Sequence, residues 1–194
     1  MVYSLPKSVE IAGERCEIRY DYRVILEIFE ALNDPGLDDE ERAFAVLQMF
    51  YVDFDSIQNY DEAISKMFWF INAGKEEDPK KKSPRLVDWN QDYPLVVSPI
   101  NHILGYEIRG VEYDPEKNTG GVHWWTILSA YMEIGDCLFA QVVKIREKKA
   151  KGKPLDKSDK EFYRQNRDLV DFKNRYTDTD KALEQMWTSG KHLT

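Results

Sequence analysis

Residues 122–149 read VHWWTILSAYMEIGDCLFAQVVKIREKK and form the longest segment with helical periodicity in the chain. Apolar side chains recur there at steps of three and four residues, and a second stripe of Trp125, Met132 and Phe139 repeats every seven. Apolar residues on two flanks are typical of a helix that packs on more than one side. We therefore predict one long central helix over residues 122–149, with the rest of the fold arranged around it.

The N-terminal residues, about 2–20, have the alternating pattern of a small β-hairpin. Val9 and Ile11 precede the segment Ala-Gly-Glu-Arg, and Cys16 and Ile18 follow it. This spacing predicts two short strands joined by a four-residue turn. Such a hairpin is marginally stable alone, so we expect it to pack on the helices that follow.

Three helical segments are predicted before the central one. Asp21 is a plausible N-cap for a helix that ends near Leu32, and the acidic run beginning at Asp38 opens a second helix that continues through Phe50. A third helix is predicted from about residue 61 to 72, with apolar side chains on one side.

Further caps follow from local sequence signals. Asp92 is the expected N-cap of a shorter helix that stops at Gly105, and Ser158 with Glu161 has the form of a capping box. Thr179 is the expected start of a last short helix.

The fold class is therefore mainly α, a helical domain around a long central helix with a small N-terminal β-hairpin. We predict a single domain over residues 1–188, because a chain of this length buries roughly 70% of its unfolded surface in one core. Residues 75–85 have the composition of a flexible charged loop, and residues 189–194 are expected to form a frayed tail.

Composition excludes several broad classes of protein. The chain has 194 residues, 42% of them hydrophobic, and a net charge of -8, which disfavours nucleic-acid binding. Its apolar runs are shorter than the roughly 18 residues of a membrane span, and its start lacks the pattern of a secretory signal. Two isolated cysteines fit a reducing compartment. We expect a cytoplasmic protein that does not bind membranes.

Charge is distributed unevenly along the chain. Residues 1–74 hold six basic and 15 acidic side chains, whereas residues 141–175 hold 12 basic and six acidic ones. The two segments could pack together within one molecule, meet head to tail between copies, or be solvated helix faces. The sequence leaves these three interpretations open.

Sequence motifs of catalysis, cofactor binding and metal binding are absent. Cys16 and Cys137 stand far apart in the sequence, without the paired spacing of a zinc site. His123 has no nucleophile placed beside it, and the expected interpretation is a satisfied residue at a helix N-terminus or a partner of a carboxylate. We expect no enzymatic activity, no cofactor and no metal site; an unrecognised hydrolase is the third alternative, after the two given below.

The aromatic residues supply the candidate binding site. Adjacent tryptophans on a helix point about 100° apart, so Trp124 and Trp125 seldom both face one core. Exposed tryptophan is a frequent anchor of protein interfaces. Our candidate partner-binding residues are Trp124, Trp125, Met132 and Phe139; the alternative is a helix buried on both sides.

Several of these stretches resemble the phage gene-product-fifteen family. The most specific is Val122–Cys137, followed by Ile145–Asp156 and Lys160–Arg164. The acidic stretch Asp38–Phe50 and the triplet Phe68–Phe70 resemble the family more loosely. Members occur in siphophages and prophages, with genes between those of the major tail protein and the tape-measure protein.

That resemblance implies a tail assembly chaperone, or a partner of one. Such a protein would bind and solubilise the tape-measure protein, help recruit the major tail protein, associate with itself, act in the host cytoplasm and be absent from the mature virion. The alternative is a structural tail or connector component. The resemblance identifies no catalytic or ligand residues.

Overall fold

The computed structural model describes residues 4–75 and 84–173 of the chain. Helices make up 57% of these residues, and a two-stranded antiparallel hairpin lies at the N-terminus, which confirms the predicted fold class. The α-helices are α1 (Tyr22–Leu32), α2 (Asp39–Phe50), α3 (Tyr60–Ile71), α4 (Trp89–Leu104), α5 (Trp124–Met132), α6 (Leu138–Ala150), α7 (Lys157–Gln165) and α8 (Arg167–Val170). Shorter elements are β1 (Ser8–Ile11), β2 (Glu14–Glu17), η1 (Phe54–Ser56), η2 (Ile108–Gly110), β3 (Tyr113–Asp114) and β4 (Thr119–Gly120).

The N-terminal hairpin has a tighter turn than the sequence predicted. Ile11 pairs with Glu14, so the turn has two residues, Ala12 and Gly13, rather than four. Both have positive φ values, 51° and 83°, as a type I′ turn requires. This turn matches the right-handed twist of the strands, and the hairpin packs on α3.

The first three helices lie where the sequence predicts them, and Asp21 is the N-cap of α1 as predicted. The Asp21 carboxylate accepts the backbone N–H of Arg23 and caps α1. Asp38 and Glu41 form a capping box at the start of α2. Each helix buries one apolar face in the main core, because the apolar residues recur at helical spacing.

Helix α4 starts earlier than predicted and is not short. Its N-cap is Asp88, whose side chain accepts the backbone N–H groups of Asn90 and Gln91. The prediction that Asp92 caps this helix is therefore wrong; Asp92 lies inside α4 and is fully buried. Gly105 ends α4 in the left-handed conformation, as the sequence predicted.

The predicted central helix over residues 122–149 is wrong, because two helices occupy this stretch. Helix α5 ends at Met132, and α6 begins at Leu138 after a five-residue connection, residues 133–137. Gly135 lies in that connection, and glycine is a poor helix former. The break allows α5 to complete the main core while α6 contributes Val142 and Ile145 to a second, smaller apolar cluster.

The end of the described chain surrounds that smaller cluster. Helix α7 is capped by Asp156 with Asp159, so the predicted capping box of Ser158 and Glu161 is wrong. The predicted last helix from Thr179 and the predicted frayed tail lie outside the described residues, as does most of the predicted charged loop. The single domain stays a prediction.

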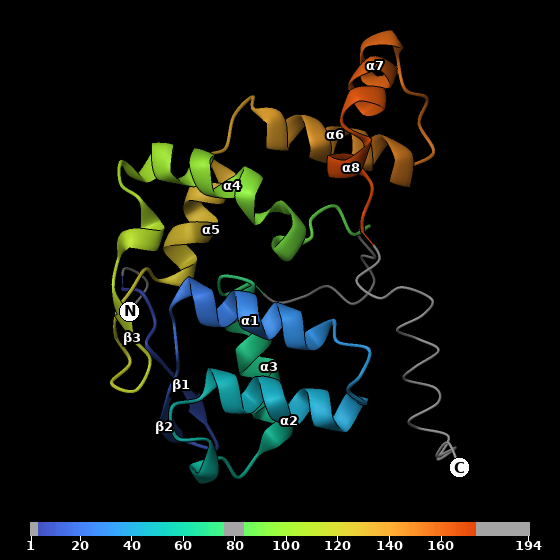
Figure 1. The fold of residues 1–194 in the computed structure, drawn as a ribbon. Coiled ribbons are helices and arrows are strands. Elements are labelled where there is room, and N and C mark those ends of the chain that lie inside the picture. Colours follow the sequence, from blue (N-terminus) through green and yellow to red (C-terminus); the bar gives the residue numbers. More distant parts are fainter. Residues whose placement is uncertain (1–3, 76–83, 174–194) are drawn as a thin grey trace, which may run out of the picture.

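Figure 1 shows the arrangement of the helices. Helices α1, α2 and α3 lie at one end with the hairpin, α4 and α5 lie in the middle, and α6, α7 and α8 lie at the other end. Within the described residues, no helix is both long and apolar enough to cross a lipid bilayer.

Candidate partner-binding groove

The four candidate binding residues do not form one surface. Trp124 and Phe139 are core residues, only 1% and 3% exposed, and Trp125 is half-buried. Met132 alone among them is well exposed, at 64%. The predicted stripe of apolar residues at seven-residue spacing does not form, because helix α5 ends at Met132. Phe139 belongs to the next helix, α6, and packs in the core.

The tryptophan pair joins α5 to the end of α3. The indole N–H of Trp124 donates to the carbonyl oxygen of Ile71 at 2.9 Å, and that of Trp125 donates to Phe70 at 2.7 Å. The last carbonyl groups of a helix have no partner within it, so these two bonds cap α3. Trp125 also contacts the ring of Trp69 edge to face. The alternative interpretation of the tryptophan pair, burial against the core, is therefore correct for Trp124.

His123 is the N-cap of α5. Its Nδ1 accepts the backbone N–H of Trp125 at 3.0 Å, which leaves Nε2 to donate to the carbonyl oxygen of Pro6 at 2.8 Å. Burial lowers the pKa of His123 below its ordinary value of 6.5. The residue is a satisfied helix cap, the first of the two roles that the sequence suggested.

This neutral cap predicts a pH dependence of stability. The pKa of His123 is lower in the folded than in the unfolded chain, so its contribution is complete above pH 6.5 and is lost as the pH falls toward the folded-state value. His123→Asn keeps a capping acceptor but does not titrate. Urea unfolding between about pH 7.5 and 5.5 should show a smaller loss of stability for His123→Asn than for the wild type. Equal losses would contradict this assignment.

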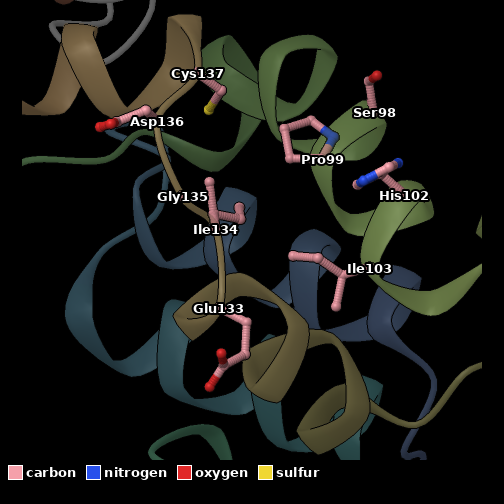
Figure 2. Close-up of a pocket in the computed structure, with 9 residues that line it drawn as sticks. All are labelled: Ser98, Pro99, His102, Ile103, Glu133, Ile134, Gly135, Asp136 and Cys137. Carbon is pink, nitrogen blue, oxygen red and sulfur yellow. The ribbon is translucent and has the colours of Figure 1, made fainter.

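An open groove lies between α4 and the connection from α5 to α6 (Figure 2). It has a volume of about 460 Å³. In Figure 2 the Cys137 side chain and the Pro99 ring lie on the groove side, while the Asp136 carboxylate points away from α4. The lining residues are Ser98, Pro99, His102, Ile103, Glu133, Ile134, Gly135, Asp136 and Cys137.

One exposed apolar side chain lines the groove, and two others are next in sequence to lining residues. Ile103, which lines it, is 39% exposed, and Leu138, which follows the lining residue Cys137, is 43% exposed. Met132 immediately precedes the lining residue Glu133. Large apolar side chains left in water beside a concave surface are typical of a site for a protein partner.

A buried ion pair holds the two walls of the groove together. The guanidinium of Arg146 on α6 donates to both carboxylate oxygens of Asp92 on α4, at 2.6 and 2.9 Å. It also donates to the carbonyl oxygens of Leu86, Leu169 and Val170. Because the planar guanidinium makes five hydrogen bonds at once, it holds α6 against α4 in addition to the apolar contacts of Leu95 with the cluster of Val142 and Ile145.

The groove also has polar side chains in its lining. These are Ser98, His102, Glu133 and Asp136, and within the described residues they make no hydrogen bonds to one another. Across residues 4–75 and 84–173, no group of three or more His, Cys, Asp or Glu side chains is placed to hold a metal ion. Cys16 and Cys137 are free thiols.

One local signal in the sequence marks this groove, and it conflicts with the predicted long helix over residues 122–149. The segment Glu-Ile-Gly-Asp at residues 133–136 interrupts an otherwise helical pattern with glycine and aspartate. Such an interruption is a local stop signal. The opposite wall has no comparable signal, since its position depends on the distant contact between Asp92 and Arg146.

Comparison with known proteins gives one match. A family model described as bacteriophage Gp15 protein matches residues 1–99, just over half of the chain. The matched range includes Asp38–Phe50 and Phe68–Phe70, whereas the stretches of the resemblance from Val122 onward lie outside it. Searches of curated proteins and of solved structures gave no significant match.

Proposed function

The chain belongs to the bacteriophage Gp15 protein family, and from this premise we propose that it is a non-catalytic tail assembly chaperone. It binds the tape-measure protein during tail morphogenesis in the host cytoplasm, keeps it soluble and leaves before the virion is complete. The observation that carries this proposal is the groove between α4 and the α5–α6 connection, with Ile103 exposed in its lining and Met132 and Leu138 exposed next in sequence to the lining residues Glu133 and Cys137.

The chemistry of the groove supports a long apolar partner. A helix that presents one apolar face binds such a groove through side chains on successive turns. Methionine adapts to partners of different shape because its side chain is unbranched and polarizable, so Met132 suits a partner that offers many similar segments. The exposed polar groups of Ser98 and His102 can pair with the ends of a bound segment.

Co-expression with the tape-measure protein encoded beside the gene tests the proposal. We expect the tape-measure protein to become soluble and to co-purify with several copies of this chain. If it stays insoluble and this chain elutes alone, the chaperone proposal is wrong. Mass spectrometry of purified particles then tests the alternative, since a structural tail or connector component is present in fixed copy number.

The double substitution Met132→Ser and Leu138→Ser is expected to weaken tape-measure binding by about tenfold or more, because it removes two exposed apolar contacts. Leu5→Ser is the matched control, since Leu5 is also exposed, at 48%, but is not adjacent in the sequence to any residue that lines the groove. Titration of a labelled tape-measure fragment gives the dissociation constants. Equal affinities of the double variant and the control would rule out the groove as the binding site.

A further inference from the structure

Two half-exposed aromatic rings lie beside each other on α2 and α3. Phe44 is 51% exposed and Tyr60 is 50% exposed. Both pack on Phe54 of η1, with ring centroids 4.8 and 5.8 Å from it. Since Phe54 itself is buried, the two outer rings are held in place and each leaves about half its surface in water.

Carboxylates surround these rings. Glu40 lies one helical turn before Phe44, Asp53 and Asp55 flank Phe54, and Asp61 follows Tyr60. All four carboxylates are exposed, and none forms an ion pair with a described residue. We call Glu40, Phe44, Asp53, Asp55, Tyr60 and Asp61 the acidic aromatic patch.

The opposite end of the molecule presents the complementary charge. Lys157, Lys160 and Arg164 are spaced three and four residues apart, so they share one face of α7, and all three are exposed. Glu161, four residues after Lys157, is exposed at the edge of this face, which has a net positive charge. None of them forms an ion pair with a described residue. Other cations of this end are paired: Lys148 bonds Asp159 on the inner side of α7. We call Lys157, Lys160 and Arg164 the cationic face of α7.

We propose that the acidic aromatic patch of one copy binds the cationic face of α7 on a second copy, head to tail. Carboxylates around exposed aromatic rings recognise Lys and Arg by ion pairing and by cation–π contact. Helices α2 and α7 lie at opposite ends of the molecule, so the two surfaces do not meet within one copy (Figure 1).

The arrangement of the surfaces sets the form of the assembly. Each copy uses two different surfaces, so binding one neighbour leaves the other surface free for the next. Such a heterologous contact extends into a filament or closes into a ring. The contact involves neither the groove nor its lining residues. The test of this contact is therefore independent of the test of the proposed function.

Charge reversal tests the contact in both directions. One variant carries Glu40→Lys, Asp55→Lys and Asp61→Lys, and the other carries Lys157→Glu, Lys160→Glu and Arg164→Glu. Each alone repels its own copies, but an equimolar mixture brings opposite charges together at both surfaces. Sedimentation velocity over a concentration series should show wild-type association that weakens with salt, monomers for each variant, and restored association in the mixture.

Two further variants control for general effects of charge and for folding. Glu27→Lys with Glu30→Lys changes exposed charge on α1, away from the patch, and should associate like the wild type. Phe44→Ser leaves the charge intact and should weaken association by about tenfold, because it removes an exposed aromatic contact. A monomeric wild type at low salt, unchanged association in the reversed variants or in Phe44→Ser, or a mixture that stays monomeric overturns the proposal.

Discussion

Arg146→Met is expected to lower the free energy of unfolding by about 3–5 kcal/mol, because it leaves a buried carboxylate without its counter-charge. Asp92 is fully buried, and the guanidinium of Arg146 donates to both of its oxygens. The same substitution removes three hydrogen bonds to backbone carbonyl groups. Urea unfolding monitored by circular dichroism measures the loss.

Two further variants distinguish the effect of losing the ion pair on stability from the effect of changing the side-chain volume. Asp92→Leu combined with Arg146→Met removes both charges, and this double variant should be more stable than Arg146→Met alone. Lys151→Met removes an exposed ion pair with Glu147 on the same helix and should cause no measurable loss. If the double variant is less stable than Arg146→Met, an unpaired Asp92 is not the cause of the instability.

Gly121→Ala is the second substitution with a large expected effect. Gly121 has a φ of 73°, and an added Cβ would lie 2.1 Å from Oδ2 of Asp21. That oxygen accepts the backbone N–H of Val122 at 2.7 Å, and Asp21 has no exposed surface. The clash must therefore displace a buried helix cap, and we expect a loss of about 3–5 kcal/mol in the free energy of unfolding.

Gly152→Ala is the matched control for backbone strain. Gly152 also has a positive φ, 63°, but an added Cβ there has no neighbour within 4 Å. Its expected cost is about 1–2 kcal/mol, the cost of the left-handed conformation alone. Thermal and urea unfolding of both variants should therefore differ clearly; equal losses would show that the contact with Asp21 is unimportant.

Helix caps were predictable where the signal is local. Asp21 caps α1 as expected, because a cap depends only on the next two or three backbone N–H groups. Asp38, expected in the first turn of the next helix, is the N-cap of α2. Asp92 has the same side chain and the same kind of sequence context, yet it is the partner of Arg146, 54 residues away. Local rules assign such a residue to a cap, since the contact that decides its role exists only in the folded chain.

At the candidate site, the prediction from sequence periodicity was wrong. The sevenfold recurrence of Trp125, Met132 and Phe139 continues across a connection that is not helical, so the three side chains face different surroundings. Met132 remains beside the proposed binding groove, and Phe139 belongs to the core. The capping of α3 by the tryptophan pair depends on the distance between two helices, and a pattern along one segment carries no information about it.

The pairing between residues 20–22 and 121–124 has a consequence for synthesis on the ribosome. The backbone N–H of Tyr22 donates to Val122, and that of Trp124 donates to Tyr20, across about one hundred residues of sequence. At elongation rates of about 5–20 residues per second, the N-terminal segment waits roughly 5–20 s for these partners. The end of α3 that Trp124 later covers is made 53 residues before Trp124, so the nascent chain exposes it for roughly 3–11 s at the same rates, and host chaperones have a defined time in which to bind it.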